Sequence, residues 1–444
     1  MDNSGEKRAL GGLKAPSEPP NAPLTGLKGP SSAPNVKADS PARGAKAGSG
    51  PILALNAGSS TLKGALYRIG TEPQLELSIK VDRVGDSKNH IAISDQNGNL
   101  KFESEQPLSA DGPPLAPIFE WLAANGYVSR LAAVGHRLVH GGMQFQKPQR
   151  ISPDILQELE KLKPLDPDHL PAALAGIRFI AAKFADVPQV ACFDTSFHHT
   201  IPRIASRYAI ERCYYDEGIR RYGFHGLSYE YILQELREME GDGADGRVIA
   251  AHLGSGASMA ALHDGRSVDT SMGFTPLEGL VMSTRSGDID PGALLYLIEQ
   301  EKMPPRELDR NLNKESGLLG VSESSGDMRT LLEKAGRDPR AAEAVDLFCY
   351  RAKKYVGAYT AALGGLDILV FTAGIGERAP AIRQRICEGL EFLGIELDPK
   401  RNEENAAVIS TPQSRIKVRV IPTNEELMIV RHVRHVLDRV GAAC

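Results

Sequence analysis

Three short glycine-rich segments constrain the fold of this chain more than any other feature, because each follows a run of apolar β-formers. They are NAGSSTLK from Asn56, HLGSGAS from His252 and TAGIGER from Thr372. Glycine lets backbone N–H groups approach phosphate oxygens closely, so each segment alone is compatible with a tight turn or with a phosphate site. Three such segments in one chain predict a nucleotide that is bound from several sides.

The first two segments are predicted to join two strands. After Lys63 the chain continues GALYRI, and after Ser258 it continues MAALHDGRSV with a turn at Asp264 and Gly265. Both patterns predict a strand, a phosphate-sized turn and a second strand. They argue against a dinucleotide-binding fold and a Walker A loop, because both need a helix directly after the glycines.

The third segment is predicted to lead into a helix. Pro380 suits a first helical turn, and Ile382, Ile386 and Leu390 then repeat at a spacing of four residues.

The rest of the chain alternates strand and helix patterns, which predicts an α/β protein. The predicted elements are a strand from Ile52, a helix from Asp154, a buried strand over 187–194, a helix after Asp290, a long helix over about 341–364 and a last helix after Asn424. The hairpin segments at Asn56 and His252 occur in similar settings, which indicates a duplicated domain.

Length and composition are typical of an ordinary enzyme of two domains, since the chain has 444 residues. A net charge of −4 gives no electrostatic argument for nucleic acid or an anionic membrane as a partner. No apolar run approaches the about 18 residues of a membrane span. The 5 cysteines are widely spaced and form no CxxC pair, which favours a reducing cytoplasm over a disulfide framework or a zinc site.

Residues 1–49 differ from the rest of the chain. They are rich in Pro, Gly, Ser, Ala and Lys and contain no aromatic residue. Such a segment cannot bury enough apolar surface to offset its ordering entropy, so we expect a disordered tail.

Between Ile52 and Gly441 the chain contains the motifs NAGSSTLK, GHRLVHGG at 135–142, CFDTSFH at 192–198, RRYGFHGLS at 220–228, DTSMGFTPLEGL at 269–280, TRSGDIDPG at 284–292, FTAGIGER at 371–378 and PTNEEL at 422–427. By these motifs and their order, this part of the chain resembles the acetate kinase family. The resemblance implies two duplicated actin-like, ribonuclease H-like domains flanking an ATP cleft. It also implies a homodimer and the MgATP-dependent conversion of acetate to acetyl phosphate and ADP.

The resemblance also implies domain boundaries. The first domain would comprise residues 50–194 with a returning C-terminal helix over 425–444, and would hold the acyl and phosphate groups. The second domain, residues 195–424, would bind the nucleotide.

The chemistry of such a transfer calls for positive charge. Moving a γ-phosphoryl group onto a carboxylate brings several negative charges together, so the site must supply cations and aligned donors. Arg137 and Arg285 are the candidates, although a lone arginine more often forms a weak surface ion pair. By the resemblance, Arg137 holds the acyl substrate and Arg285 stabilises the transferring phosphoryl group. His225 then resembles the donor that polarises the phosphoryl oxygens at the transition state.

Acidic and amide residues are candidates for handling a proton or a metal ion. Asp194 matches the family's acidic residue that accepts a proton or orients magnesium, and its structural alternative is a turn cap. Asn56 and Glu425 match the magnesium-associated positions, and oxygen ligands suit Mg²⁺, with Mn²⁺ as an alternative. Glu425 would also complement the dipole of the last helix.

The remaining nucleotide positions come from the resemblance. Lys63 would contact phosphate, and its structural alternative is a solvated strand lysine. The other ATP-binding residues would be His252, Leu253, Gly254, Ser255 and Gly256 at the phosphates, then Asp327, Met328 and Arg329, and finally Gly374, Ile375, Gly376, Glu377 and Arg378 at the adenosine.

A small apolar pocket would select the acyl group. Val139, Leu165, Phe224 and Pro276 match the family's pocket residues. Valine rather than alanine at the first of these positions favours acetate over propionate. Because one methylene is worth only about 1–3 kcal/mol in such a pocket, we expect propionate to be a slower substrate.

The chain departs from the family's pattern in three places. Residues 164–171 read PLDPDHLP where the family commonly reads PLHNP, so Asp166 occupies a histidine position and His169 lies nearby in sequence. Ser255 and Arg378 each replace a common asparagine. These departures bear on nucleotide preference, acyl preference and rate.

Two alternatives to an acetate kinase stay open. A propionate or butyrate kinase of the same family would differ in the pocket residues. A catalytically lapsed nucleotide-binding relative would have lost Arg137, Asp194, His225 or Arg285, and the chain keeps all four. A sugar kinase fits less well, because GFHG and the paired arginines have no evident purpose in phosphorylating a hydroxyl group.

Overall fold

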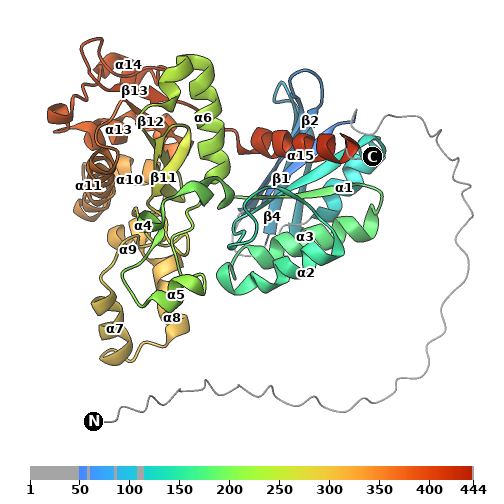
Figure 1. Ribbon diagram of the computed structural model, residues 1–444, viewed down its shortest axis with the longest axis horizontal. Helices are drawn as coiled ribbons and strands as arrows, with labels where there is room; N and C mark the ends of the chain where they lie inside the picture. The colour runs from blue at the N-terminus through green and yellow to red at the C-terminus, as the bar shows by residue number, and fades with distance from the viewer. Residues whose placement is uncertain (1–49, 58–60, 85–87, 108–114, 443–444) are drawn as a thin grey trace, which may run out of the picture. The chain divides into compact units, whose positions relative to one another are not determined.

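The computed structural model describes residues 50–57, 61–84, 88–107 and 115–442, and these residues form two β-sheets flanked by helices (Figure 1). The predicted tail, residues 1–49, and the tip of the first glycine-rich segment, residues 58–60, lie outside the described residues.

The first sheet has eight strands in the order β5-β4-β3-β2-β1-β6-β8-β7. β1 is antiparallel to β2 and parallel to β6, which in turn is parallel to β8. The strands are β1 Ile52–Ala57, β2 Thr61–Arg68, β3 Gln74–Val84, β4 Lys88–Asp95, β5 Leu100–Pro107, β6 Ala133–Leu138, β7 Gln149–Arg150 and β8 Gln189–Phe193.

The second sheet has five strands in the order β11-β10-β9-β12-β13. β9 is antiparallel to β10 and parallel to β12, which is parallel to β13. The strands are β9 Val248–Leu253, β10 Ala257–His263, β11 Arg266–Thr270, β12 Ile368–Thr372 and β13 Lys417–Val420.

The two sheets share one topology. The run β3-β2-β1-β6-β8 of the first sheet has the same strand order and the same directions as β11-β10-β9-β12-β13 of the second. The predicted α/β class and the predicted duplication are therefore confirmed. In both sheets a glycine-rich segment joins the central strand to its antiparallel neighbour, as the sequence predicts for the first two segments.

Helices cover both sheets. They are α1 Leu115–Ala124, α2 Pro153–Lys161, α3 Leu170–Lys183, α4 Arg203–Ser206, α5 Arg212–Asp216, α6 Gly226–Glu240, α7 Pro291–Glu299, α8 Pro305–Arg310, α9 Gly317–Ser322, α10 Met328–Lys334, α11 Pro339–Ala362, α12 Ala373–Arg378, α13 Pro380–Cys387, α14 Pro399–Glu403 and α15 Glu425–Ala442.

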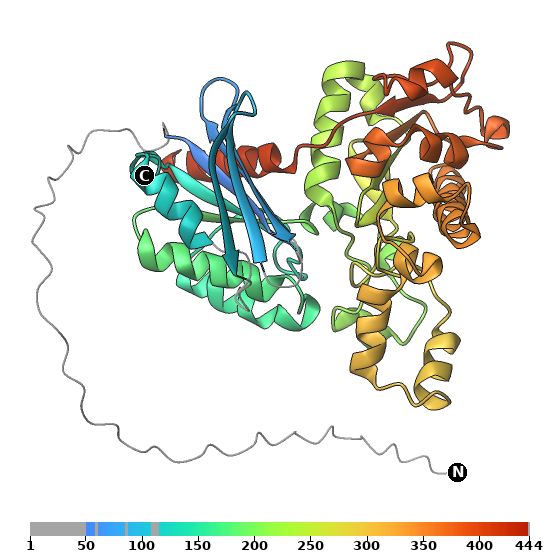
Figure 2. The ribbon, with the colours of Figure 1, turned by 180° about the vertical axis from the view of Figure 1, so that it is seen from behind.

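The central strand of the first sheet is buried on both faces, which explains its continuous apolar run. Ile52 and Ala54 pack in one cluster with α15, whereas Leu53 and Leu55 pack in another with α1 and α3. Seen from behind, α1 to α3 lie along one side of the blue strands and the red helix α15 lies on the other (Figure 2).

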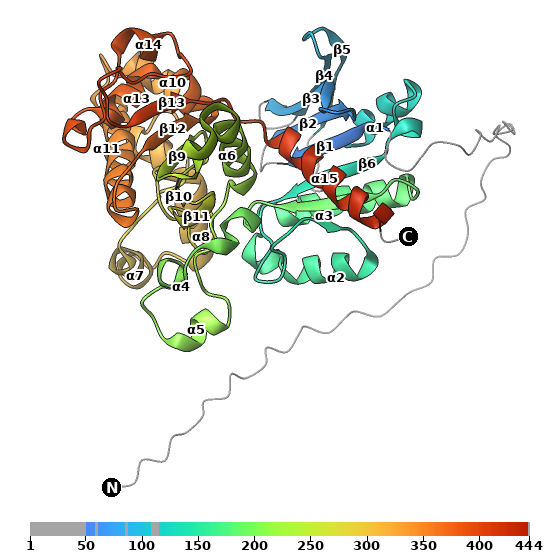
Figure 3. The same cartoon turned by 45° about the horizontal axis from the view of Figure 1, so that its top comes forward.

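The central strand of the second sheet alternates in the same way. Val248 and Ala250 pack with α6, whereas Ile249 and Ala251 pack with α11 and α13. Figure 3 shows α6 beside β9 and β10. α15 and α6 thus cover equivalent faces of the two sheets.

Most predicted elements are confirmed, with one correction. Ser152 and Asp290 cap α2 and α7 with their side chains, and α13 begins at Pro380. The third glycine-rich segment, however, is not a loop that only precedes a helix, because residues 373–378 form the short helix α12 themselves. Thr372 has extended backbone and Ala373 adopts a left-handed φ of 62°, so the chain turns sharply from β12 into that helix.

The predicted domain boundaries at 194/195 and 424/425 stay a prediction, although α15 packs on the first sheet as expected of a returning helix. Within the described residues, none of the helices combines the length and the apolar character needed to span a bilayer.

The packing of α15 on the first sheet can be tested at Gly135 in β6. A Cβ atom added there would lie 2.4 Å from Cγ2 of Ile429 and 2.6 Å from Cγ2 of Val433. We expect Gly135→Ala to lower the free energy of unfolding by about 1–3 kcal/mol, because overpacking a core forces the helix away. Urea denaturation measures the change.

Gly357→Ala in α11 serves as the matched control, because an added Cβ there meets no atom within 4 Å. This variant should be neutral or more stable by up to about 1 kcal/mol. Equal stability of Gly135→Ala and the unmodified protein would contradict the packing.

Candidate active site

Two stacked histidines lie at the second glycine-rich segment. His252 belongs to β9, and His225 precedes α6 with a left-handed φ of 58°. Their ring centroids are 4.1 Å apart and their planes differ by 15°. Burial lowers the pKa of His252 to about 4, and burial together with His252 and nearby arginines lowers the pKa of His225. Both rings are therefore neutral near pH 7.

Arg285 lies beside His225 and has no carboxylate within ion-pair distance among the described residues. A Cβ atom added to Gly256 would lie 3.3 Å from Nε2 of His225 and 3.8 Å from Nη1 of Arg285. The guanidinium donates to the carbonyl oxygen of Pro276 at 3.3 Å, and burial lowers its pKa. A cation and a neutral imidazole thus meet at the glycine turn, where a phosphate could approach.

Arg137 is held by a buried ion pair at the end of the first sheet. Its Nη2 and Nε lie 2.5 and 3.0 Å from Oδ2 of Asp194, and its Nη1 donates to Oδ1 of Asn56 at 3.0 Å. Although burial alone lowers it, the pKa of Arg137 is raised by Asp194 and Glu425. β6 and β8 are parallel neighbours, which brings Arg137 and Asp194 to the same edge of the sheet.

Carboxylates converge on the other side of Asn56. Its Nδ2 donates to Oε2 of Glu425 at 2.7 Å and to Oε1 of Glu426 at 3.1 Å. Burial acts to raise the pKa of Glu425, but Arg137 and His252 outweigh it and lower that pKa. The pKa of Glu426 is raised by burial and by Glu425.

These oxygens suit a hard cation such as Mg²⁺ in their chemistry. Oδ1 of Asp194 is buried and lacks a hydrogen-bond partner among the described residues, and Glu425 and Glu426 lie nearby around Asn56. Over the described residues, no three His, Cys, Asp or Glu side chains are arranged to enclose a metal ion. The donor set therefore fits an ion that keeps several waters and phosphate ligands of its own.

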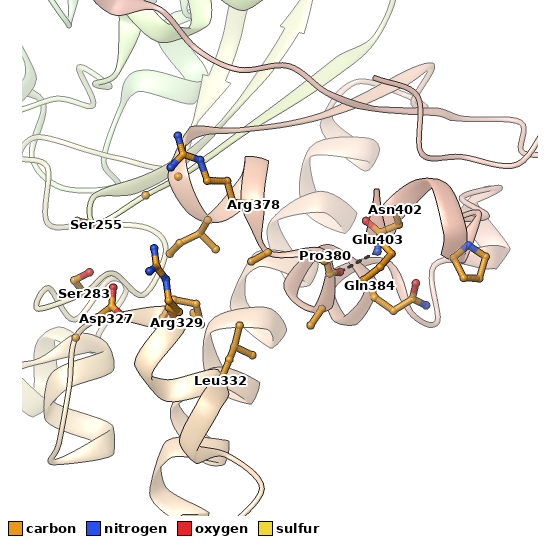
Figure 4. Close-up of a pocket in the computed structure, with 18 residues that line it drawn as sticks. Ser255, Ser283, Asp327, Arg329, Leu332, Arg378, Pro380, Gln384, Asn402 and Glu403 are labelled. Atoms are coloured by element: carbon orange, nitrogen blue, oxygen red, sulfur yellow. Dashed lines mark hydrogen bonds between the residues drawn. The ribbon is translucent and has the colours of Figure 1, made fainter. Parts of the chain in front are cut away.

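A cavity of about 960 Å³ opens next to the second glycine-rich segment (Figure 4). Arg329 and Arg378 lie at one end of it with Ser255, while Gln384, Asn402 and Glu403 lie at the other. The predicted residues Gly254, Ser255, Asp327, Met328, Arg329, Gly374, Ile375 and Arg378 all line this cavity. Its size is that of a small-molecule site.

The other predicted nucleotide residues do not line the cavity. Leu253 is fully buried, and Gly376 offers its carbonyl oxygen to Arg383 at 2.8 Å. Oε1 of Glu377 accepts from the backbone N–H of Thr423 at 3.0 Å. Lys63 is exposed on β2 directly opposite Asn56, so it lies on the side of Glu425 and Glu426 rather than at the cavity. His252 and Gly256 belong to the histidine stack and the turn described above.

The predicted acyl-pocket residues fall into separate groups. Val139 and Phe224 are buried in one core cluster, whereas Leu165 packs against another around Leu162 and Phe193. Pro276 contacts Arg285 through its carbonyl oxygen. The structure thus places Pro276 next to Arg285.

The three departures from the family pattern all have defined positions. Asp166 is buried, and its Oδ1 lies 2.8 Å from Nδ1 of His169, so the aspartate and the histidine form one pair. Ser255 is exposed at the cavity, where its carbonyl oxygen accepts from Ser283 at 3.0 Å. Arg378 lines the same cavity.

Several residues of the site were not predicted. Glu426 follows Glu425 in PTNEEL and could have been found from that motif. Arg383 is fully buried and donates to Gly376, Asn402 and Asn405, and it has no carboxylate partner in the described part of the chain. No local pattern marks Arg383, Gln384 or Glu403, because their role depends on contacts between α12, α13 and α14.

Known proteins resemble this chain over most of its length. The model of the Acetokinase family matches residues 51–431. The acetate kinase of Rhodopseudomonas palustris is 46% identical over 393 residues, which cover 87% of this chain and 98% of that protein. The crystal structure of Porphyromonas gingivalis acetate kinase has a TM-score of 0.78 at 38% identity, covering 87% of this chain and 100% of that one. A propionate kinase from Francisella tularensis has a TM-score of 0.79 at 37% identity, covering 86% and 98%.

Proposed function

The chain belongs to the acetokinase family, and we propose that it transfers the γ-phosphoryl group of ATP reversibly to acetate, giving acetyl phosphate and ADP. The observation that carries the proposal is the meeting of His225 and Arg285 at Gly256, with Arg137, the ion-pair partner of Asp194, among the charged groups that act on both. Two guanidinium groups and a neutral donor are what a carboxylate and a phosphoryl group require when they approach each other.

Each predicted residue has a distinct task in this reaction. Arg137 binds the acetate carboxylate, and Asp194 holds the guanidinium in place through its short contact. Arg285, which has no ion-pair partner of its own among the described residues, stabilises charge on the transferring phosphoryl group. His225 donates a hydrogen bond to the same group. The cavity lined by Arg329 and Arg378 receives the rest of the nucleotide.

We propose Mg²⁺ as the divalent ion, with Mn²⁺ as a substitute. Asn56, Glu425 and Asp194 would hold it through waters, and the bound ion would neutralise phosphate charge. Lys63, opposite Asn56 on β2, would contact phosphate on the same side.

A cytoplasmic location is proposed as well. Within the described part of the chain, Cys192, Cys213, Cys349 and Cys387 are all free, as expected of a protein in a reducing compartment.

The choice of acyl substrate tests the proposal most simply. A coupled assay of the purified protein with MgATP should give the highest kcat/KM with acetate, a value about 10-fold or more lower with propionate and a still lower value with butyrate. Val139→Ala, which removes two methyl groups from a buried side chain, should bring kcat/KM for propionate closer to kcat/KM for acetate.

Equal kcat/KM values for the three acids would contradict a pocket that selects the acyl group by size. A higher kcat/KM for propionate than for acetate would support the propionate kinase alternative. Absence of acetyl phosphate would refute the function.

Arg285 is predicted to act on the chemical step. Arg285→Ala should lower kcat by ~10³-fold or more while KM for ATP changes little, because an arginine that stabilises a transferring phosphoryl group is worth that much. Steady-state kinetics measures both constants. Arg247→Ala is the control: that arginine pairs with Asp367 away from the site, so kcat should persist. A near-normal kcat of Arg285→Ala would show that Arg285 does not stabilise the transferring phosphoryl group.

We also propose that the protein is a homodimer, as the family resemblance implies. α7 buries none of its side chains, and Leu295 and Tyr296 on it are 56% and 58% exposed. Ile204 in α4 and Ile210 between α4 and α5 are 86% and 49% exposed. Figures 1 and 3 show α4, α5 and α7 gathered at one end of the region built around the second sheet. Apolar patches of this kind mark interfaces, and a second copy of the chain is the simplest partner.

Light scattering tests the dimer. The wild type should have twice the mass of one chain, and the double variant Leu295→Glu/Tyr296→Glu should be monomeric, because charges would be buried at the interface. Phe392→Glu, at a side chain that is 75% exposed elsewhere, should stay dimeric. A monomeric wild type, or a double variant that remains a dimer, would contradict the proposal.

A further inference from the structure

Beneath the ring of His225 lies a chain of hydrogen bonds that the proposed reaction does not yet use. Nδ1 of His225 is 2.9 Å from Oγ of Ser258 in β10, and the same Oγ contacts the phenol oxygen of Tyr229 in α6. Ser258 and Tyr229 are both fully buried. α6 and β10 lie close together (Figure 3), so the three side chains form one buried relay from α6 through β10 to the histidine.

Only one arrangement of the hydroxyl and ring protons gives every proton within this relay an acceptor. Ser258 is the hydrogen-bond partner of the Tyr229 hydroxyl among described side chains, so the phenol proton points to Oγ of Ser258. The serine proton then has Nδ1 of His225 as its acceptor. If Nδ1 carried a proton instead, one of the two buried hydroxyl protons would have no acceptor, which costs more than a hydrogen bond gains.

We infer that Ser258 and Tyr229 are positioning residues that fix His225 as the neutral tautomer with its proton on Nε2, the nitrogen that faces Gly256 and Arg285. This inference rests on the proposed function, in which His225 donates to the phosphoryl group. Nε2 is thereby a donor before substrate arrives. The opposite tautomer would present a lone pair to phosphoryl oxygens and repel them.

The surroundings of His225 favour the same neutral state. The charged and titratable groups that act on it are His252 of β9, Arg137 of β6, Arg285 and His198. Burial and these neighbours lower the pKa of His225. A second proton on the ring would place a positive charge beside two guanidinium groups and would leave the Ser258 proton without an acceptor.

His252 is anchored in a parallel way. Its Nδ1 lies 2.8 Å from Oγ of Ser228, which contacts Oγ1 of Thr423 at 2.9 Å. Ser228 and Tyr229 are consecutive residues in the first turn of α6. One helical turn therefore orients both stacked rings. Thr423 is only partly buried, so its hydroxyl proton can turn to solvent and the Ser228–Thr423 bond sets no tautomer. The inference is therefore confined to His225.

Kinetics of Ser258→Ala form one part of the test. The variant should lower kcat by about tenfold, the equivalent of one lost hydrogen bond, while KM for ATP and acetate stays within about twofold. Tyr229→Phe should lower kcat less, because the serine proton can still reach Nδ1. The control is Ser206→Ala, which removes another buried serine hydroxyl that lies 3.1 Å from a phenol oxygen, that of Tyr215, and contacts no histidine. It should keep wild-type kcat. Wild-type kcat in Ser258→Ala would overturn the positioning role.

Nitrogen NMR of the wild type, labelled with [¹⁵N]histidine, forms the other part and does not depend on activity. The His225 resonances, assigned by their absence from His225→Asn, should show a protonated Nε2 and an unprotonated Nδ1. A proton on Nδ1, or on both nitrogens near pH 7, would overturn the inference. A protein with the expected tautomer that fails to phosphorylate acetate would refute the proposed function and leave the inference standing.

Discussion

The buried contact between Arg137 and Asp194 connects most of the groups around the site. Asp194 accepts from the Arg137 guanidinium through its side chain, and its carbonyl oxygen accepts the N–H of Gly226, the first residue of α6. The approach is so close that a Cβ atom added to Gly226 would lie 2.1 Å from that oxygen. Asp194 thus fixes the arginine that we propose to bind the acyl group and also the start of the helix that follows His225. Removing one partner of such a buried ion pair lowers the free energy of unfolding by several kcal/mol, because the other charge is left buried without a partner. A substitution at either residue therefore affects both.

The site combines fixed cations with neutral histidines. Arg137 has the carboxylate of Asp194 as its partner, whereas Arg285 has no carboxylate partner among the described residues and is held by a carbonyl oxygen. His225 and His252 stack without charge, which avoids adding two more cations to the same small volume. An arginine without a counter-ion is costly in the resting protein, and an incoming phosphate would relieve that cost. The hydroxyl groups of Ser228, Tyr229 and Ser258 orient the two histidine rings through hydrogen bonds and add no charge.

The sequence predicted the parts of the molecule that depend on local patterns. The hairpins at Asn56 and His252, the helices α2 and α7 and the duplicated topology follow from glycines, apolar runs and helix-start patterns. The helix α12 was missed because glycines at 374 and 376 oppose a helix, and its place between β12 and α13 overrides that preference. Arg383 and the Tyr229–Ser258 relay were missed for another reason: they act through contacts between residues far apart in sequence, which no spacing encodes.

The most direct test of the account is a crystal structure of the protein with ADP, Mg²⁺, acetate and a planar aluminium fluoride in place of the transferring phosphoryl group. The account predicts that Arg285 and Nε2 of His225 both lie within hydrogen-bond distance of the fluoride, that Arg137 contacts the acetate carboxylate, and that ADP occupies the cavity lined by Arg329 and Arg378. A fluoride that contacts neither Arg285 nor His225, or a nucleotide bound outside that cavity, would contradict it.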